Sequence, residues 1–567
     1  MADTDSRRSA PGALGLPRKL AANAYGGLRR LAVRRWLGGA QRPWLLLRLG
    51  PGTRETRPAG WFWSASEAGR QAGPSLLSAL RVLDAAGRDH RIGGVLLRFT
   101  GPINGWSKAL ALRRAVADAR AAGTRVAAWA ESYDAPDYLV ASAAERVWLP
   151  PSGQLFLVGL RTDHFYLKGL LDRLDVRADV VKVGGYKAAA EGLLREGMSP
   201  EQREQTEAWL DDAVAELVAG VAKGRGLPES EVRARIDQGP YPAAAAREAG
   251  LVDGCAYPDE LDRGLEELGA ELEIGPGGDG EPRARLVDAG AYAASGSLDP
   301  VWQPLVSHAP RIAYAVAQGT IARSDGRARL GAGIDGEAWR RRLAALAMRP
   351  EIAAVVLRID SPGGDAVASD LLHRAVTRLA ASKPVVVSMG DVAASGGYFM
   401  AAGAHRIFAE AATLTGSIGV VGGKLDLEGL YRRLGIGRES LERGARAGIL
   451  SEARAFRPDE REAVRREMEA LYATFVARVA EGRGLSEDAV RKLGGGRVWS
   501  GRRALGGGLV DRLGGPLEAL GEAAERAGFS VDTRFGVEVH PRHPGWLDWR
   551  GWLTGGAGAR RASSGSV

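Results

Sequence analysis

The sequence predicts an α/β protein built from two tandem copies of one domain, and three observations support this fold class. First, residues 92–98 (Ile-Gly-Gly-Val-Leu-Leu-Arg) match residues 352–358 (Ile-Ala-Ala-Val-Val-Leu-Arg) at an offset of 260. Second, short β-branched apolar runs alternate with helical patterns in both copies. Third, a Gly/Pro-rich stretch at 275–282 separates the copies. At 567 residues, 45% of them hydrophobic, the chain is long enough for each copy to bury its own core.

The elements of the second copy are the clearest. Residues 352–359 and 384–389 are apolar runs rich in valine, as in the strands of a buried parallel sheet. Residues 366–381, between these runs, have helical periodicity. A long polar helix is predicted over 457–481, with a counterpart in the first copy over 199–223. We therefore divide the chain into a basic amphipathic N-terminal arm (1–43), a first domain (44–273), a linker (274–310), a second domain (311–536) and a basic tail (537–567).

The net charge of +9 is concentrated at the two ends of the chain. Residues 1–43 contain nine Arg or Lys and two Asp, and residues 540–567 contain four Arg and one Asp, so the body is nearly neutral. This distribution argues against a nucleic-acid-binding surface over the folded part. No stretch reaches the roughly 18 consecutive apolar residues of a membrane-spanning helix. No apolar core of a cleavable export signal follows the N-terminal arginines.

Both ends also have an amphipathic pattern. Apolar residues recur at near-helical spacing in the arm, and tryptophans recur at three-residue steps in the tail (Leu20, Ala24, Leu28, Leu31 and Trp36; Trp546, Trp549 and Trp552). Such segments can lie on an anionic membrane surface. They are equally consistent with two disordered basic tails. The sequence leaves both interpretations open.

Metal and disulfide chemistry have little support in the sequence. Cys255 is the only cysteine, which excludes an intramolecular disulfide and a zinc ribbon. The seven histidines have no metal-ligand spacing. His405 is the histidine nearest to Ser395 along the chain, and we expect a structural or surface role for it. We therefore predict neither a metal site nor an organic cofactor.

The most informative difference between the copies is a complementary loss of two residues. Ser395 lies in the second copy, and Ala135 occupies the matching position of the first. Lys187 lies in the first copy, where the second has Arg446. Each copy has kept one member of a serine and lysine pair, which indicates a hydrolase with its active site between the copies. Either motif alone is more often a turn or a solvated loop, and it is the reciprocal loss that favours catalysis.

Glycine-rich turns accompany the serine. Residues 361–364 (Ser-Pro-Gly-Gly) follow a predicted strand, where backbone N–H groups can point outward and bind an oxyanion. Gly396 and Gly397 follow Ser395 at a predicted helix N-terminus, whose dipole favours developing negative charge. The first copy has Gly-Pro-Ile-Asn at 101–104 instead, so it has lost the oxyanion loop together with the serine.

Lys187 has the sequence surroundings that a lysine base requires. No histidine stands beside Ser395, and a lysine can take the serine proton only as a neutral amine, which needs burial to lower its pKa from about 10.4. Lys187 follows two glycines and a tyrosine and precedes three alanines, with no carboxylate before Glu191. Arg446 could not replace it, because a guanidinium group stays protonated in proteins.

Five segments resemble the signal peptide peptidase A family in its long tandem form. They are residues 359–364 (Ile-Asp-Ser-Pro-Gly-Gly), 386–389 (Val-Val-Ser-Met), 393–398 (Ala-Ala-Ser-Gly-Gly-Tyr), 414–419 (Leu-Thr-Gly-Ser-Ile-Gly) and 185–187 (Gly-Tyr-Lys). The resemblance runs from about residue 44 to 536, and the motifs are specific as a set. It implies the fold of the Clp protease and crotonase superfamily, with a β-α spiral core in each half.

The resemblance also implies roles for individual residues. Ser395 would be the nucleophile, Lys187 the general base and Ser417 the residue that orients the lysine amine. The oxyanion hole would consist of the backbone N–H groups of Gly363, Gly364 and Gly396. Members of the family form bowl-shaped tetramers and degrade signal peptides left in the membrane. The long form usually begins with a membrane-spanning anchor, and here a basic arm stands in its place.

The sequence therefore predicts a serine endopeptidase with a Ser-Lys dyad that degrades signal peptides and other apolar peptides at a membrane. We expect a homotetramer, no nucleic-acid partner, and peripheral membrane association on a side that the sequence does not assign. Two alternatives stay open. A crotonase-like enzyme acting on acyl-coenzyme A would share the fold and the oxyanion loop, and a non-catalytic membrane scaffold would account for the basic ends.

Overall fold

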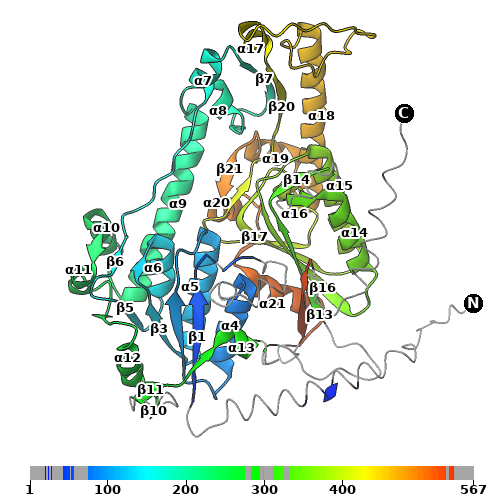
Figure 1. Cartoon of the computed structure of the whole chain (residues 1–567). Helices are drawn as coiled ribbons and strands as arrows, with labels where there is room; N and C mark the ends of the chain where they lie inside the picture. The colour runs from blue at the N-terminus through cyan, green and yellow to red at the C-terminus, as the bar shows by residue number, and fades with distance from the viewer. Residues whose placement is uncertain are drawn as a thin grey trace, which may run out of the picture.

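The structure of the protein, a computed structural model, describes residues 42–51, 53–55, 74–274, 282–293, 311–323, 333–530 and 535–541, together with the single positions 20, 23, 24, 27 and 298. These residues form two α/β units of matching topology, one in each half of the chain (Figure 1). The predicted α/β class with a tandem repeat is confirmed. Most of the arm, and the tail beyond 541, lie outside the described residues, and the proposed amphipathic and tryptophan patterns lie there with them.

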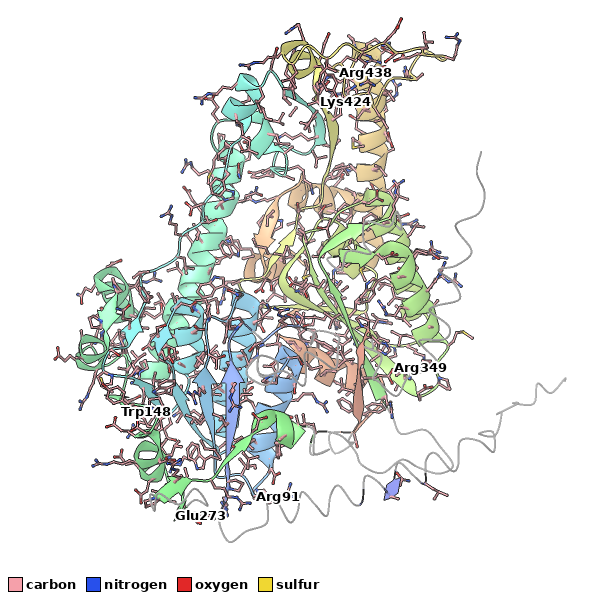
Figure 2. All side chains as sticks on the ribbon, in the orientation of Figure 1. Arg91, Trp148, Glu273, Arg349, Lys424 and Arg438 are labelled. Carbon is pink, nitrogen blue, oxygen red and sulfur yellow. The ribbon has the colours of Figure 1, made fainter. Side chains whose placement is uncertain are left out.

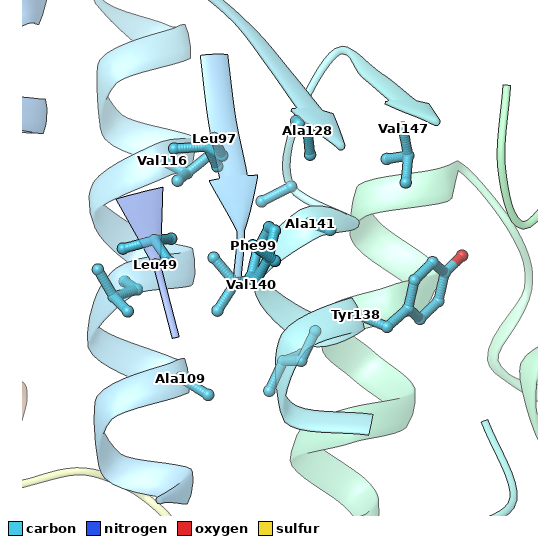
Figure 3. Packing of buried hydrophobic residues seen from close by; sticks show 14 of the residues in the cluster. Leu49, Leu97, Phe99, Ala109, Val116, Ala128, Tyr138, Val140, Ala141 and Val147 are labelled. Carbon is cyan, nitrogen blue, oxygen red and sulfur yellow. The ribbon is translucent and has the colours of Figure 1, made fainter. Parts of the chain in front are cut away.

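The first half contains a six-stranded sheet in which every neighbouring pair is parallel. Its mostly apolar strands are buried against helices on both faces, as expected for a parallel sheet. In spatial order they are β12 (Leu286–Asp288), β1 (Trp44–Leu49), β2 (Gly94–Phe99), β3 (Arg125–Trp129), β5 (Arg146–Leu149) and β9 (Gly254–Cys255). Figure 3 shows part of this core, with Leu97 and Phe99 of β2 among residues of the covering helices.

The second half repeats this order and adds two strands. The repeated strands are β23 (Gly536–His540), β13 (Arg311–Gln318), β16 (Ile352–Ser361), β17 (Val385–Ala394), β18 (Arg406–Ala409) and β22 (Arg512–Leu513). β19 (Leu414–Gly416) and β21 (Val498–Ser500) continue the sheet from the far end of β17. The strands predicted at 352–359 and 384–389 are confirmed. β17 runs further than predicted and ends directly before Ser395.

Helices cover both sheets, and short strands complete the connections. In the first half the helices are α4 (Leu76–Arg88), α5 (Trp106–Ala121), α6 (Ala135–Ala141), α7 (Lys168–Arg173), α8 (Glu191–Leu194), α9 (Pro200–Arg225), α10 (Glu229–Gln238), α11 (Ala243–Glu248), α12 (Leu261–Glu267) and α13 (Ala289–Tyr292). In the second they are α14 (Gly336–Ala347), α15 (Ala366–Ala380), α16 (Gly396–Ala401), α17 (Glu428–Arg433), α18 (Pro458–Arg483), α19 (Glu487–Leu493), α20 (Gly501–Gly506) and α21 (Pro516–Arg526). The short strands form β4 (Ser132–Tyr133) with β6 (Gln154–Leu155) and β8 (Tyr241–Pro242), and β14 (Thr320–Ala322) with β15 (Gly333–Asp335).

The predicted helices of both copies are confirmed. α15 matches the predicted helix at 366–381, and it starts at Asp365, whose side chain accepts a hydrogen bond from the Ala368 N–H at 2.8 Å. The two long polar helices are α9 and α18. Each ends at a left-handed glycine, Gly226 or Gly484, whose N–H bonds to a carbonyl of the last turn. Figure 1 shows that both extend to the same end of the molecule.

At that end the two halves share a pair of strands. β7 (Arg177–Val183) of the first half pairs antiparallel with β20 (Val420–Asp426) of the second, with Val183 opposite Val420. β7 and β20 lie between α9 and α18 in Figure 1, and Figure 2 labels Lys424 of β20 close to this tip. Because Lys187 follows β7 and Ser417 precedes β20, this pairing brings the two residues to the same place.

Residues 282–292, which we expected to belong to an irregular linker, form regular structure. β12 pairs in parallel with β1, with Leu45 opposite Val287, and β11 (Pro282–Ala284) pairs with β10 (Leu272–Ile274). In the second half β23 has the same place beside β13, and it extends past the boundary expected at 536. β11 and β12 have three residues each, which is too short for a periodic pattern, so local sequence reasoning could not detect them.

A buried ion pair joins the halves inside the protein. Arg358 of β16 has Nη2 2.7 Å from Glu55 Oε1, and both side chains are fully buried. Arg358 Nη1 also donates to Ser388 Oγ at 3.0 Å. Burial of such a pair is tolerated only when its hydrogen bonds are satisfied. The equivalent Arg98 of the first half instead lies over the ring of Trp129. The pair with Glu55 therefore attaches β16 to the first half of the chain.

Candidate active site

Ser395 lies at the sharp junction between β17 and α16. Its backbone has φ 54° and ψ −120°, an unfavourable conformation for a residue with a side chain. The Ser395 N–H donates to Gly416 O at 2.8 Å, and its carbonyl accepts from the Phe399 N–H at 2.8 Å. These bonds hold the serine at the helix N-terminus that the sequence predicts.

Lys187 reaches Ser395 from the other half of the chain. Its side chain belongs to the loop after β7, and the residue is only 5% exposed. Lys187 Nζ lies 3.0 Å from Ser395 Oγ, 3.0 Å from Ser417 Oγ and 3.0 Å from Ser417 O. The structure thus brings together the three side chains that the sequence singles out, although Lys187 and Ser395 are 208 positions apart.

Burial changes the protonation of this lysine. Loss of water lowers the pKa of the Lys187 amine to about 8, and no carboxylate counteracts this effect. The nearest acidic residue along the chain, Glu191, is engaged elsewhere, since it accepts a hydrogen bond from Ser199 Oγ at 2.9 Å. At pH 7 roughly a tenth of the Lys187 side chains are therefore neutral.

Ser417 holds the lysine amine in a defined orientation. Like Ser395 it has a positive φ, 52°, and these two serines and Asp175 are the non-glycine residues with this conformation in the described part of the chain. Its N–H donates to Arg497 O at 2.7 Å. A neutral Lys187 amine that donates its two hydrogens to the Ser417 oxygens has its lone pair left for the Ser395 hydroxyl.

The glycine loop predicted to supply oxyanion donors packs directly against Ser395. A Cβ built on Gly363 would lie 2.8 Å from Ser395 Cβ and 2.7 Å from Gly396 N, and Gly363 has φ +102°. The Gly363 N–H donates to Ser361 Oγ at 3.1 Å. Within the described residues, the N–H groups of Gly364 and Gly396 make no hydrogen bond. Of the three predicted donors, these two are thus available to a bound oxygen.

The matching positions of the first half have structural roles. Ala135 is buried at the start of α6, which Asp134 caps by accepting a hydrogen bond from the Asp137 N–H at 2.9 Å. Asp137 in turn accepts from the Ile103 N–H at 2.8 Å, in the loop that replaces the glycines. Burial raises the pKa of this carboxyl to about 8.

Two further residues considered in the sequence lie outside the site. Arg446 is exposed, and its Nε donates to Asp459 Oδ2 at 3.1 Å. His405 Nδ1 accepts a hydrogen bond from the Val385 N–H at 3.1 Å, which supports β17 from its start and is a structural role, as expected. No group of three His, Cys, Asp or Glu that could hold a metal ion occurs among the described residues.

Sequence reasoning missed two features next to the site. Gly495 accepts a hydrogen bond from the Tyr186 N–H at 2.9 Å, and the Gly496 N–H donates to Ile418 O at 2.7 Å. The run of three glycines at 494–496 is the signal that could have indicated this close approach of two backbones. Asp391, just before Ser395, accepts a hydrogen bond from the Ser107 N–H at 2.8 Å, and burial raises the pKa of its carboxyl to about 6.

Two matching α/β halves with a strained serine from one half against a buried lysine from the other define a duplicated α/β protein with one shared site. The model of "Peptidase family S49" matches the chain twice, over residues 118–273 and 377–530. The chain belongs to this family of serine peptidases, and the resemblance noted in the sequence is confirmed.

Relatives agree with this assignment. The chain is 33% identical over 453 residues to "Serine protease SPPA, chloroplastic" of Arabidopsis thaliana. The aligned region covers 79% of this chain and 65% of that protein. It is 31% identical over 465 residues to "Protease 4" of Salmonella typhi, and the aligned region covers 80% of this chain and 72% of that protein. It is also 33% identical over 170 residues to "Putative signal peptide peptidase SppA" of Enterococcus faecium, covering 30% and 49%. The chain thus spans about two thirds of the length of the first two relatives.

Solved structures with similar parts include a ClpP1 mutant from Listeria monocytogenes, with a TM-score of 0.25, 16% identity, and coverage of 36% of this chain and 94% of that chain. A mutant of the 1510-N membrane-bound stomatin-specific protease in complex with a substrate peptide has a TM-score of 0.26 and 18% identity, and the match covers 44% of this chain and 99% of that chain.

In the described residues, no helix is both long and apolar enough to span a bilayer.

Proposed function

We propose that this protein is a serine endopeptidase in which Ser395 and Lys187 form a catalytic dyad. The observation that carries the proposal is the 3.0 Å contact between Lys187 Nζ and Ser395 Oγ. It occurs where burial lowers the pKa of the lysine to about 8, so that a neutral amine is available. Membership of a serine peptidase family supports the class of reaction.

Acylation begins when neutral Lys187 takes the proton of the Ser395 hydroxyl. The serine oxygen attacks the peptide carbonyl carbon and forms a tetrahedral intermediate. Lys187 then gives the proton to the leaving amine, and the C–N bond breaks to leave an acyl-enzyme. In deacylation the same amine takes a proton from water, whose oxygen attacks the ester carbonyl. Lys187 then returns this proton to Ser395 Oγ as the ester C–O bond breaks, which releases the acid and restores the Ser395 hydroxyl.

The N–H groups of Gly364 and Gly396 are suited to bind the oxyanion of both intermediates. Gly396 N also lies at the N-terminus of α16, where the partial charges of the helix are positive. A donor of this kind contributes roughly 2.7–4 kcal/mol to transition-state stabilisation.

The substrates we propose are extended apolar peptides, including signal peptides released from preproteins. The Enterococcus faecium relative, which is named as a putative signal peptide peptidase, supports this class. The Ser395–Lys187 pair also favours peptide hydrolysis over acyl-coenzyme A chemistry, which has no need of this pair. A non-catalytic scaffold would have no need of it either.

The experiment compares wild type, Ser395→Ala and Lys187→Ala on casein and on a synthetic signal peptide, after circular dichroism has shown that all three are folded. Both variants are expected to lose at least about 10³-fold in kcat/KM. Full turnover by Lys187→Ala would contradict the assigned base. Binding of an acyl-coenzyme A without peptide cleavage by wild type would favour the crotonase-like alternative.

We also propose that the tip of the molecule mediates self-association into a homotetramer. The tip exposes large apolar side chains from both halves, among them Phe165 (84% exposed), Leu434 (63%), Leu441 (88%) and Leu450 (77%). A Leu441→Ser, Leu450→Ser double variant is expected to sediment as smaller species than wild type. An unchanged sedimentation coefficient would place the interface elsewhere.

The basic ends are proposed to attach the protein peripherally to a membrane. Charge-driven attachment weakens with salt, so cosedimentation of the full chain with anionic vesicles is expected at low ionic strength and should fall in high salt. The full chain and a 44–536 truncation are compared. Equal pelleting of the two proteins would contradict a role for the ends.

A further inference from the structure

A group of four side chains beside Lys187 takes no part in the proposed chemistry. Tyr186 and Glu204 come from the first half, and Arg497 and Trp499 from the second; we call them the Arg497 cluster. The Arg497 guanidinium lies 4.7 Å from the ring centroid of Tyr186 and 4.4 Å from that of Trp499. Glu204 accepts hydrogen bonds from Arg497 Nη2 at 2.6 Å and from Tyr186 Oη at 2.7 Å. The cluster therefore links the two halves through one cation.

The backbone of the same residues holds the lysine and its partner. Tyr186 immediately precedes Lys187, and the carbonyl of Arg497 accepts the hydrogen bond of the Ser417 N–H at 2.7 Å. Arg497 thus contacts the neighbour of Lys187 with its side chain. With its backbone it holds Ser417, which in turn binds the Lys187 amine. One residue is connected to both ends of the Lys187 side chain.

The loop before Arg497 packs on Lys187 without space for a side chain. A Cβ on Gly496 would lie 2.5 Å from Lys187 Cβ, and Gly496 has φ +83°. A Cβ on Gly184 would lie 2.3 Å from Gly495 O. Because the two backbones are in direct contact, a movement of the 494–497 loop moves the lysine as well.

Stability alone does not account for the cluster. The Arg497 side chain is 20% exposed and that of Glu204 52% exposed, and an ion pair of this exposure contributes little to folding. Two ring contacts and a shared carboxylate do, however, restrict the guanidinium to one geometry. Geometry is what a general base requires, because a displacement of about 1 Å can lower a rate roughly 100-fold.

We propose that Arg497 is a positioning residue that keeps the Lys187 amine on the Ser395 hydroxyl. It acts through Tyr186 and Ser417 and does not touch the reacting atoms. The inference rests on the proposed Ser395–Lys187 dyad. Without the guanidinium, the loops of the two halves separate, the amine loses its fixed place between the serines, and water enters.

The test compares Arg497→Ala and Arg497→Lys with Arg503→Ala as the matched control. Arg503 is also an arginine of the second half paired with a carboxylate of α9, its Nε lying 2.7 Å from Asp212 Oδ2. Within the described residues, Arg503 makes no hydrogen bond to Tyr186 or Ser417. The control therefore removes a similar link between the halves without disturbing the lysine. kcat and KM on a fluorogenic peptide are measured from pH 6 to 10, together with thermal unfolding.

Arg497→Ala is expected to lower kcat about 30-fold with KM within about 3-fold of wild type. The midpoint of its pH–rate profile is expected to rise by about one unit, since a more solvent-exposed Lys187 amine binds its proton more tightly. Arg497→Lys, which keeps a cation against the rings, is expected to recover about half of the loss on a logarithmic scale. Arg503→Ala is expected to match wild type in kcat, in KM and in the midpoint of the pH–rate profile.

The proposal is overturned if Arg497→Ala and Arg503→Ala give the same kcat and the same pH midpoint, or if Arg497→Ala changes KM alone. Should Arg497→Ala not fold, Glu204→Ala removes the carboxylate that fixes Arg497 and Tyr186 at a half-exposed position. It is expected to lower kcat about 5-fold with the same upward shift of midpoint, and wild-type behaviour would overturn the proposal. Failure of the dyad itself would be recognised separately, by full activity of Lys187→Ala.

Discussion

A lysine side chain in water is protonated at neutral pH, and Lys187 differs because the fold removes most of its water. The residue is 5% exposed, and burial lowers the pKa of its amine to about 8. Ser417 replaces part of the lost hydration with two hydrogen-bond acceptors. The amine can therefore change its protonation state within the range in which peptidases work.

The first prediction at the residue scale is the pH dependence of activity. A lysine acts as a base only when neutral, and the neutral fraction of Lys187 rises with pH through the pKa of about 8. kcat/KM is therefore expected to rise about 10-fold per pH unit below pH 7 and to level off above pH 8 to 9. The profile is measured with a small peptide substrate between pH 5.5 and 9.5. A flat profile with chemistry rate-limiting would contradict a lysine base.

The second prediction concerns stability. The pKa of Lys187 is lower in the folded protein than in the unfolded chain, so a protonated Lys187 destabilises the fold below pH 8. This penalty declines as pH rises from 8 towards 10.5. Lys187→Met, which keeps the shape but removes the charge, is expected to increase the free energy of unfolding at pH 6 by about 2 kcal/mol.

Urea unfolding at pH 6 and at pH 9.5 tests this expectation. The gain of Lys187→Met over wild type should be smaller at the higher pH. Arg446→Met, at the exposed matching position, serves as the control and is expected to change stability little at either pH. Equal gains of Lys187→Met at both pH values would mean that packing, not charge, is responsible.

At the scale of elements, the site is made by two turns that meet. β17 delivers Ser395 to the start of α16, and β16 delivers the 361–364 loop beside it. Gly363 lies so close to Ser395 that a side chain has no place between them. A glycine there thus allows the proposed oxyanion loop to lie directly against Ser395.

The prediction for this pair of turns is that Gly363→Ala lowers kcat/KM at least about 100-fold. The added Cβ would lie 2.8 Å from Ser395 Cβ, and its residue would have to adopt φ +102°, so the loop must move. Gly521→Ala in α21 is the control, because a Cβ there meets nothing within 4 Å. The control should keep full activity and gain up to about 1 kcal/mol of stability. Wild-type activity of Gly363→Ala would show that the loop is not part of the site.

At the scale of the whole molecule, the two halves pack against each other around the site. Leu77 of the first half packs in a hydrophobic cluster formed mainly by β13, β16 and α21 of the second. Arg114 of α5 places Nη2 2.5 Å from Glu410 Oε1 and Nε 2.6 Å from Glu518 Oε1. The Arg358–Glu55 pair and the β7–β20 strand pair add two further links. These contacts set the distance between Lys187 and Ser395.

The prediction at this scale is that Glu55→Ala destabilises the protein by about 3 kcal/mol, because it leaves the Arg358 charge buried without its partner. Asp163→Ala, which removes an exposed ion pair with Arg161, is the control and should change stability by less than about 0.5 kcal/mol. Urea unfolding followed by tryptophan fluorescence measures both. An effect of Glu55→Ala no larger than that of the control would mean that the pair contributes nothing to the association of the halves.

Local pattern was enough to predict the duplicated α/β architecture, the strands β16 and β17 and the helices α9, α15 and α18. Comparison of the two copies was enough to single out Ser395 and Lys187, because each is present in one copy and replaced in the other. Each of these depends on neighbours within a few positions or on comparison of the chain with itself. The period of a strand, a glycine turn and the absence of a serine from one copy can therefore be recognised from the sequence alone.

Only the tertiary structure decided that β12 joins the first sheet, that β7 pairs with β20, that Arg358 binds Glu55 and that Arg497 lies against Tyr186. These contacts join residues far apart in sequence, and no local periodicity encodes them. The pKa of Lys187 belongs to the same group, because it depends on how much water the surrounding atoms exclude. The residue types were set by the sequence, whereas the burial of Lys187 and its 3.0 Å approach to Ser395 arise only when the two halves pack together.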